Sequence, residues 1–380
     1  MGAGQPWAAR RGNLSGRGDY RKNLMTSPDD NADLAQDEGS ETAAELTVER
    51  ERELIAQLQS LRGEIDAELS KVIIGQKDVV EQLLIALLSG GHCLITGAPG
   101  LAKTLLVNSI AQLFDLKFNR IQFTPDLMPA DITGTEVLEE ENGHRSMRFI
   151  AGPVFANVLL ADEINRTPPK TQSALLEAMQ EHQVTAAGQV RRLDEPFFVL
   201  ATQNPIEMEG TYPLPEAQLD RFMFNVLIDY LPEDDEVAVV QQTTSKRRDQ
   251  VKSLFHGDLI PELNQVVQRV PIAEEVVRYA VRLAAASRPQ QTGTPEFINE
   301  LVSWGAGLRA AQNLVLGGKA RALLDGRPYV SAADIQALAQ PVLRHRILPN
   351  YRAEAEGVTT EALISRLLSH IEHPKQEAVA

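Results

Sequence analysis

The sequence has very little cysteine and no long hydrophobic run. Its single cysteine, Cys93, excludes an internal disulfide, and the apolar residues around it predict a packed thiol in a buried strand. No apolar stretch approaches the roughly 18 residues that a membrane span needs. The basic residues between positions 10 and 22 are not followed by the apolar region of a secretory signal. We therefore expect a cytoplasmic protein that does not insert into a membrane.

The sequence is also short of basic residues. Lys and Arg total 37 against 52 Asp and Glu, so the formal net charge is −15 at pH 7. A chain that is acidic overall, without an extended Lys/Arg-rich tract or alternating aromatic and basic residues, is poorly suited to a phosphate backbone. We therefore expect no nucleic-acid partner.

The remaining composition is that of an ordinary globular protein, with 43% hydrophobic and 23% charged residues. A length of 380 residues allows two structured domains and a tail. Residues 1–45 carry many Gly, Ser, Asn, Asp and Glu but almost no periodic apolar residues, so we expect a disordered tail. The change from basic to acidic composition at Met25 leads to the hypothesis that Met25 is the natural start.

From Leu46 onward, helical patterns alternate with short apolar runs. Leucines and an isoleucine between positions 54 and 69 recur at spacings of three and four, which predicts a helix. Strands are predicted at residues 92–97, 118–124, 158–163 and 197–204, and helices at residues 104–114 and 171–182. Apolar strands that alternate with helices indicate an α/β fold with a parallel sheet covered on both faces.

After about residue 232 the strand signals stop. The sequence then predicts helices, including residues 274–287, 297–324 and 331–343. We therefore expect a smaller, all-helical domain after the α/β domain. The predicted division is a disordered tail at 1–45, an α/β core at 46–231, a helical domain at 232–373 and a C-terminal tail at 374–380.

The segment GAPGLAKT lies between the first predicted strand of the sheet and the helix that follows. It differs from the phosphate-binding pattern G-x-x-x-x-G-K-[ST] at Ala102, where the pattern has glycine. The added methyl group is tolerable if Ala102 takes helical dihedrals. The alternative for this stretch alone is a Gly-Pro turn with an incidental lysine. The residues predicted to surround the nucleotide phosphates are Gly97, Ala98, Pro99, Gly100, Leu101, Ala102, Lys103 and Thr104.

Two later strands also end in polar residues. Asp162 and Glu163 end the strand at 158–163, where one carboxylate can hold the Mg²⁺ shell and the next can polarise a water for attack on the γ-phosphate. Asn204 ends the next strand, where its amide can orient that water. Taken alone, Asp162 and Glu163 could be a charged strand end that enters solvent, and Asn204 could belong to an ordinary Asn-Pro turn. Together with the loop they predict nucleotide hydrolysis.

Long stretches of the chain resemble the MoxR family of AAA+ ATPases. They are RIQFTPDLMPADITGTEV, GPVFANVLLADEINRTPPKTQSALLEAMQEHQV and FFVLATQNPIEMEGTYPLPEAQLDRF, and the resemblance covers roughly residues 50 to 370. It implies a parallel-sheet, P-loop AAA+ core followed by a helical lid, with ATP and Mg²⁺ as ligands. Alanine before the motif lysine is common in this family, so Ala102 becomes a family feature.

The resemblance also implies a role for each motif residue. Lys103 would contact the β- and γ-phosphates, and Thr104 and Asp162 would hold Mg²⁺. Glu163 would be the catalytic base and Asn204 the first sensor. The residues that would line the adenine belong to the VIIGQ segment and include Ile74, Gly75 and Gln76.

Two arginines complete the implied site. Arg221, in AQLDRF, would be an arginine finger that reaches the γ-phosphate of a neighbouring subunit; the alternative is a surface arginine on a helix. Arg309, in GAGLRA, would be a second sensor with which the lid reaches back to the nucleotide; the alternative is a surface ion pair. The family usually has G-A-S-P-R-A here. Gly307-Leu308 replaces Ser-Pro and removes a rigid helix start, which leaves the angle of Arg309 open.

Two predicted hairpins resemble inserts of this family. Residues 121–151, with a turn at 141–143, resemble the hairpin that interrupts the second helix in this clade. Residues 183–193 resemble a second hairpin that turns near Gly188. In related machines such hairpins face a central pore or a bound partner. Arg191 and Arg192 are expected to be exposed strand charges, with contact to a client as the alternative.

These features predict an ATP-hydrolysing, chaperone-like protein that remodels or matures a protein client. The resemblance implies a homo-oligomeric ring, with a hexamer favoured, and a partner that carries a von Willebrand factor A (VWA) domain. The alternatives are a nucleotide-gated scaffold, a magnesium-chelatase-like subunit and, with least support, a nucleic-acid motor. The sequence does not identify the client, the ring size or the nucleotide dependence of assembly.

Overall fold

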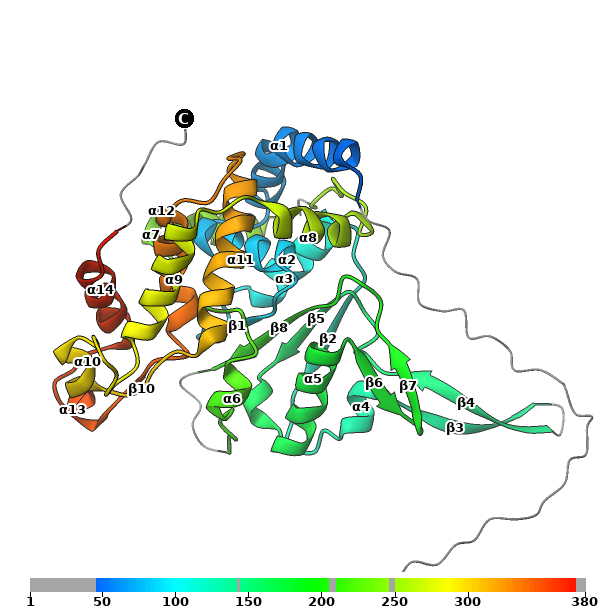
Figure 1. Cartoon of the computed structure of the whole chain (residues 1–380). Helices are drawn as coiled ribbons and strands as arrows, with labels where there is room; N and C mark the ends of the chain where they lie inside the picture. Colours follow the sequence, from blue (N-terminus) through cyan, green and yellow to red (C-terminus); the bar gives the residue numbers. More distant parts are fainter. Residues whose placement is uncertain (1–45, 142–143, 205–209, 246–249, 374–380) are drawn as a thin grey trace, which may run out of the picture. The chain divides into compact units, whose positions relative to one another are not determined.

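The computed structural model describes residues 46–141, 144–204, 210–245 and 250–373 (Figure 1). The predicted tails at 1–45 and 374–380, and the hypothesis about Met25, fall outside the described residues. The residues from Leu46 onward form one unit by their contacts. The predicted boundary between core and lid at residues 231 and 232 stays a prediction.

Among the described residues, five strands form a parallel sheet in the order β2-β5-β8-β1-β9. They are β1 (Cys93–Gly97), β2 (Phe118–Gln122), β5 (Val158–Asp162), β8 (Phe198–Gln203) and β9 (Phe224–Ile228). The predicted parallel sheet is confirmed. Cys93 is buried in β1, and burial raises the pKa of its thiol, so the prediction of a packed thiol is also confirmed.

Helices cover both faces of this sheet because its side chains alternate between two apolar cores. Val158 and Leu160 of β5 belong to the core shared with α2 and α3, whereas Leu159 and Ala161 belong to the core beneath α5. The covering helices are α2 (Lys77–Leu88), α3 (Lys103–Leu113) and α5 (Pro169–Glu181), and α1 (Val48–Ser70) packs on α3 (Figure 1). Strands that are buried on both faces read as continuous apolar runs, which is why the sequence revealed them.

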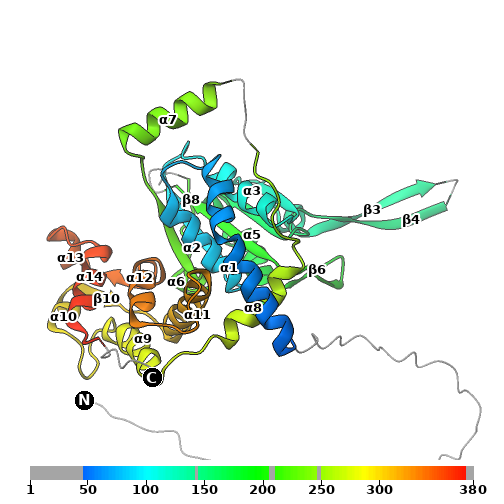
Figure 2. The ribbon, with the colours of Figure 1, turned by 90° about the horizontal axis from the view of Figure 1, so that it is seen from above.

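Both predicted hairpins are present. The first pairs β3 (Gly134–Glu141) with β4 (His144–Ala151) after the short helix α4 (Pro129–Thr133), and it extends beyond the sheet in Figures 1 and 2. Its predicted turn at Asn142 and Gly143 lies outside the described residues. The second pairs β6 (Gln183–Ala186) with β7 (Gln189–Arg192).

The two hairpins touch through one arginine. Arg192 is exposed, as predicted, but the guanidinium carbon of Arg191 lies 3.7 Å from the centre of the Phe149 ring in β4. Arg191 is only partly exposed, so the prediction that it is an exposed strand charge is wrong, because the face of an aromatic ring attracts a cation.

The lid consists mainly of helices. They are α7 (Glu233–Thr244), α8 (Leu259–Arg269), α9 (Glu274–Ala286), α10 (Glu296–Leu301), α11 (Leu308–Leu324), α12 (Ala332–Leu343), α13 (Tyr351–Ala355) and α14 (Thr360–His370). Two short strands, β10 (Val302–Trp304) and β11 (Leu348–Pro349), pair antiparallel among them. The predicted helical lid is confirmed, and this short strand pair is an addition that the sequence did not predict.

The predicted helix over residues 297–324 is interrupted where the chain approaches α9. A Cβ atom on Gly305 would lie 2.2 Å from the carbonyl oxygen of Ser287, so only glycine allows this contact. Glycine is also a poor helix former, and the two glycines at 305 and 307 weaken the helical pattern. The chain therefore leaves α10 as a strand and starts again as α11.

The lid packs closely against the end of the sheet. A Cβ atom on Gly317 of α11 would lie 2.8 Å from Leu338 and 3.1 Å from the Met223 side chain, just before β9. Arg346 is buried here, and its guanidinium donates to the carbonyl oxygens of Phe222 and Met223. These contacts hold the middle of α11 and the segment after α12 against the start of β9.

Candidate functional site

The phosphate-loop segment connects β1 to α3 as predicted. Ala102 precedes α3 with φ 55° and ψ 25°, and Gly100 has φ 85°. Ala102 is thus left-handed, so the expectation that it takes ordinary helical dihedrals is wrong. Left-handed residues turn successive N–H groups toward one concave side, which is the geometry of an anion-binding nest. For alanine this conformation costs roughly 1–2 kcal/mol.

Lys103 folds back over this loop. Its Nζ donates to the carbonyl oxygen of Gly97 at 2.5 Å. Burial lowers the pKa of Lys103, and the nearby Asp162 and Glu163 act in the opposite direction. Gly97 itself has no room for a side chain, because a Cβ atom would lie 2.4 Å from the carbonyl oxygen of Ile228. The ammonium group is therefore positioned between the loop and the two carboxylates.

The acidic pair at the end of β5 is held by the neighbouring strand β8. The Thr202 hydroxyl donates to Asp162 Oδ1 at 2.6 Å, and it accepts from the Glu163 backbone N–H at 2.8 Å. Glu163 has φ 57°, so the chain turns sharply just after Asp162 and enters the short 3₁₀ helix at Ile164–Arg166. The pair therefore has a fixed backbone position at the carboxyl edge of the sheet.

Each of the two carboxylates already has a side-chain partner. Asp162 Oδ2 lies 2.6 Å from Arg120 Nη2. Glu163 Oε2 accepts from Gln122 Nε2 at 2.9 Å and lies 3.0 Å from Arg166 Nη1. Both contacts involve the same oxygen, Oε2, so they orient the Glu163 carboxylate at the ends of β2 and β5.

Sequence reasoning missed Gln122, Arg120, Thr202 and Arg166. One signal was available, because Gln122 ends β2 and pairs in register with Asp162. Polar residues that end adjacent parallel strands meet at one edge, as was argued for Asp162 and Asn204. Arg166 carried no such signal, since its contact depends on the turn at Glu163.

Asn204 directly follows β8 and is buried, with 6% of its surface exposed. Strand β8 lies between β5 and β1. Asn204 therefore sits at the same edge of the sheet as the acidic pair and the phosphate loop, between the strands that carry them. The role of Asn204 as the first sensor stays a prediction.

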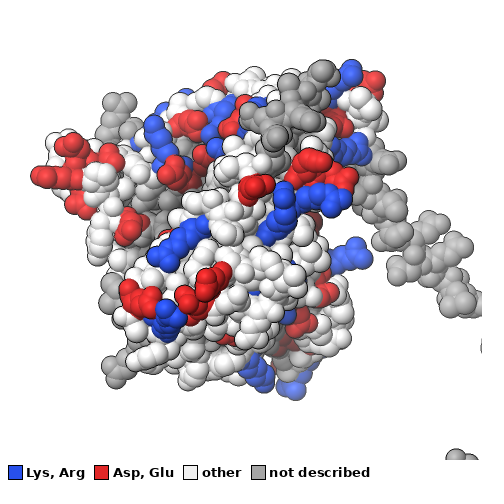
Figure 3. Space-filling view, turned by 60° about the vertical axis from the view of Figure 1, so that its left-hand side comes forward, with Lys and Arg blue, Asp and Glu red and all other residues white. Residues whose placement is uncertain are grey.

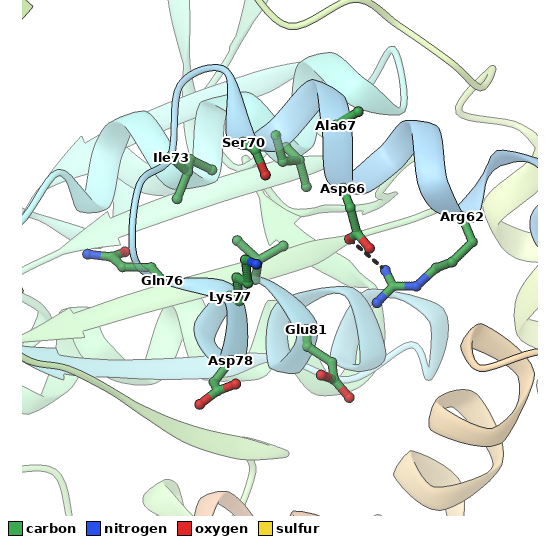
Figure 4. A pocket seen from close by; sticks show the side chains of 11 residues that line it. Arg62, Asp66, Ala67, Ser70, Ile73, Gln76, Lys77, Asp78 and Glu81 are labelled. Carbon is green, nitrogen blue, oxygen red and sulfur yellow. Dashed lines mark ion pairs between the residues drawn. The ribbon is translucent and has the colours of Figure 1, made fainter. Parts of the chain in front are cut away.

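The segment predicted at the adenine connects α1 to α2. Gln76 lines a cavity of about 450 Å³ between these helices, together with the ion pair of Arg62 and Asp66 (Figure 4). A Cβ atom on Gly75 would lie 2.5 Å from Asp235 of α7, so the segment also packs against the first turn of the lid. The adenine role of Ile74, Gly75 and Gln76 stays a prediction.

Arg221 and Arg309 line a second cavity of about 330 Å³. Gly91 and His92, which directly precede β1, also line it. Arg221 Nη1 donates to the carbonyl oxygen of Leu176 at 2.9 Å. The structure therefore places both arginines at the amino end of β1, whereas the phosphate loop follows its carboxyl end. A five-residue strand spans about 17 Å.

Arg309 is held at this position by the core. Its Nη1 lies 3.3 Å from Asp220 Oδ2, and Asp220 Oδ1 lies 2.7 Å from Nε of the buried Arg346. Arg309 thus forms the ion pair that was the alternative prediction, and it lies away from the loop of its own chain. Contact with a nucleotide would have to involve the loop of a neighbouring copy.

The same cavity has a buried histidine in its wall. The backbone N–H of Val199 donates to His92 Nδ1 at 3.1 Å, so Nε2 carries the proton and donates to the carbonyl oxygen of Met179 at 3.0 Å. Burial lowers the pKa of His92 to about 4. Nearby, His182 Nδ1 donates to the carboxylate of Glu195, and this hydrogen bond raises the pKa of His182.

Across the described part of the chain, no helix is both long enough and apolar enough to cross a membrane.

Comparison with known proteins agrees with this geometry. Residues 92–224 match the ATPase family associated with various cellular activities (AAA), and residues 294–367 match an AAA lid domain. The chain is 41% identical to Chaperone MoxR1 of Mycobacterium tuberculosis over 330 residues, which cover 86% of this chain and 85% of that protein. It is 30% identical to Protein MoxR of Paracoccus denitrificans over 327 residues, which cover 81% of this chain and 95% of that protein. The crystal structure of a candidate ATPase from Cytophaga hutchinsonii has a TM-score of 0.79 and 43% identity, covering 85% of this chain and 98% of that one.

Proposed function

The chain belongs to the MoxR family of AAA+ ATPases, and on that premise we propose that it couples ATP hydrolysis to the remodelling or maturation of a protein partner. The observation that carries the proposal is the edge of the sheet where the phosphate loop, the acidic pair and Asn204 meet. The relative named as a chaperone supports the chaperone-like part. The partner that we propose is a VWA-domain protein or its client.

The residues at this edge fit ATP bound with Mg²⁺. The loop offers an anion-binding nest and the Lys103 ammonium group, and a hydroxyl and a carboxylate are the hard oxygen ligands that Mg²⁺ prefers. We assign Mg²⁺ to Thr104 and Asp162. When bound, the metal supplies positive charge at the phosphate oxygens.

Three residues of the chain would then have separate roles in hydrolysis. Lys103 orients the outer phosphates, Asn204 orients the attacking water, and Glu163 accepts a proton from that water. The bonds with Gln122 and Arg166 engage Oε2 and orient the Glu163 carboxylate for this step.

We further propose a homo-oligomeric ring, with a hexamer favoured, located in the cytoplasm. Arg221 and Arg309 lie at the end of β1 that is remote from the loop, so they can act only on the nucleotide of a neighbouring copy. Hydrolysis would then depend on the position of that neighbour, which links the chemistry to the geometry of the ring.

One observation favours a second candidate, a nucleotide-gated scaffold with little turnover. Glu163 Oε2 is bonded to Gln122 and Arg166, and a base that these side chains hold away from the attacking water would leave ATP bound but intact. A nucleic-acid motor has less support, since Figure 3 shows Lys and Arg interspersed with Asp and Glu on the face that it displays.

ATP turnover per subunit, measured against protein concentration with and without a purified VWA-domain protein, tests the proposal. A ring ATPase predicts turnover that rises with concentration and changes when the partner is added. Tight ATP binding without turnover under either condition would instead support the scaffold. Turnover that rises on adding DNA, and that does so less at high salt, would support the motor.

A further inference from the structure

Two large apolar side chains are exposed beside Arg309. Trp304, the last residue of β10, is 65% exposed, and Leu308, the first residue of α11, is 64% exposed. Residues 305–307 connect them, and Arg309 follows directly. Single exposed apolar residues are common on protein surfaces. This pair is unusual because it flanks the segment that carries a candidate catalytic arginine.

The connecting loop holds these side chains in place. The Ala306 N–H donates to the hydroxyl of the buried Ser287 at 2.9 Å, and Arg288 Nε donates to the Ala306 carbonyl oxygen at 2.7 Å. Gly305 lies against the Ser287 backbone. The loop is therefore fixed on both sides, and the backbone that carries Trp304 and Leu308 needs no ordering before a partner binds.

The position of the arginines indicates what covers this surface. Arg221 and Arg309 lie at the amino end of β1, and the arginines beside the acidic pair, Arg120 and Arg166, are already engaged with Asp162 and Glu163. The site at the phosphate loop is therefore completed by a second copy of the chain. Any copy that presents its loop to Arg309 must approach Trp304 and Leu308 as well.

The face around the phosphate loop has matching chemistry. On the proposed function it binds the negative charge of a nucleotide, which complements Arg221 and Arg309. It also exposes an apolar side chain, since Leu105 directly follows Thr104 and is 43% exposed. Tryptophan is among the residues most enriched at the centres of protein interfaces.

We propose that Trp304 and Leu308 dock one copy of the chain onto the phosphate-loop face of a second copy, so that Arg309 and Arg221 reach the nucleotide there. This inference rests on the proposed ring ATPase and names the surface through which its subunits meet. The fixed loop at 305–307 makes the docking side chains and Arg309 move as one piece. Loss of the docking contact therefore lowers assembly without altering the loop that binds ATP.

Tryptophan fluorescence gives a direct test, because the chain contains two tryptophans, Trp7 and Trp304. In the full-length Trp7→Phe variant all tryptophan emission comes from Trp304. Adding Glu163→Gln slows hydrolysis, so that ATP can be held bound while protein concentration is raised and assembly is followed by sedimentation. We expect the emission to shift to shorter wavelength, and quenching by acrylamide to fall severalfold, in step with assembly.

Variants of the same surface give the second readout. Trp304→Ser is expected to raise the concentration at half-assembly by roughly tenfold or more, while Trp304→Phe keeps most of the parent behaviour. Tyr329→Ser is the matched control: Tyr329 is 51% exposed but lies beyond the other end of α11, about 24 Å along the helix. ATP binding to dilute protein should be unchanged in all three.

Two outcomes contradict the inference in different ways. The first outcome is assembly without a change in Trp304 emission, together with an unchanged concentration at half-assembly in Trp304→Ser. This result overturns the docking surface but leaves the ring ATPase intact. Absence of assembly at every concentration, with turnover per subunit independent of concentration, overturns both the docking surface and the proposed ring.

Discussion

The two ends of strand β1 differ in what they can do. At the carboxyl end the phosphate loop, Asp162 and Glu163 gather around one point, with Lys103 folded between them. At the amino end a cavity holds Arg221 and Arg309 above the buried, neutral His92. The first end carries the residues to which we assign ATP binding and cleavage, whereas the second carries the two arginines that we assign to a neighbouring subunit's nucleotide. On the proposed function, these are two half-sites that meet only between subunits.

This separation has a structural cause in each half. The carboxyl end follows from parallel strands whose polar last residues share one edge. The amino end follows from the docking of the lid, because Arg346 and Asp220 fix Arg309 against the core. Changes at one end should therefore alter binding or chemistry within a subunit, and changes at the other end should alter only assembled protein.

The largest effect on turnover is expected from a substitution at the amino end of β1. Arg221→Ala removes the cation that stabilises the charge of the transition state, and such arginines contribute about 10³ to 10⁵ in turnover. We expect turnover of assembled protein to fall by about 10⁴, with ATP affinity of dilute protein unchanged, in steady-state kinetics and calorimetry. The exposed Arg192→Ala is the control. Retention of more than a tenth of the parent turnover by Arg221→Ala would rule out the finger.

The next effect belongs to the carboxyl end. Glu163→Gln keeps the shape of the side chain but removes the base, so turnover should fall by about 10³ while ATP stays bound. Rapid-quench measurement of bound ATP and ADP separates binding from cleavage. Glu177→Gln on the exposed side of α5 should behave like the parent. Normal turnover in Glu163→Gln would assign the base to another residue.

Acid should lower the stability of the fold through His92, at the amino end of β1. Its pKa is about 4 in the folded chain and ordinarily about 6.5, so the unfolded chain binds an extra proton between these values. Stability is therefore lost as pH falls from about 6.5, and the loss reaches about 3 kcal/mol near pH 4. Urea unfolding of the parent and of His92→Gln at pH 7 and pH 4.5 measures the difference. Equal pH slopes in the two proteins would contradict the assignment.

The smallest effect concerns Ala102 in the phosphate loop. Glycine relieves the left-handed strain but adds conformational freedom to the unfolded chain. We therefore expect Ala102→Gly to raise the free energy of unfolding, measured with urea, by about 0.5 kcal/mol. Ala187→Gly, at a second left-handed alanine in the β6–β7 turn, should gain a similar amount. Ala111→Gly in the buried face of α3 should lose stability. A loss in Ala102→Gly would mean that the methyl group makes a favourable contact.

The sequence predicted the structural features that are determined by neighbouring residues. Strand runs, the loop and the polar residues after β5 and β8 could be identified because each leaves a pattern within a few residues. The hydrogen bond between Gln122 and Glu163, the ring contact of Arg191 and the ion pair of Arg309 could not, because they depend on which segments the fold brings together. The interruption at Gly305 depends on α9 in the same way.

Mixing two inactive proteins tests most directly whether the half-sites of different subunits combine. Arg221→Ala supplies an intact carboxyl end, and Glu163→Gln supplies an intact amino end, so a mixed assembly contains some complete sites. A shared site predicts that turnover appears on mixing, is highest near equal amounts and exceeds that of either protein alone. Absence of recovered turnover at every ratio, under conditions where both variants co-assemble, would show that the two ends of β1 do not form one site.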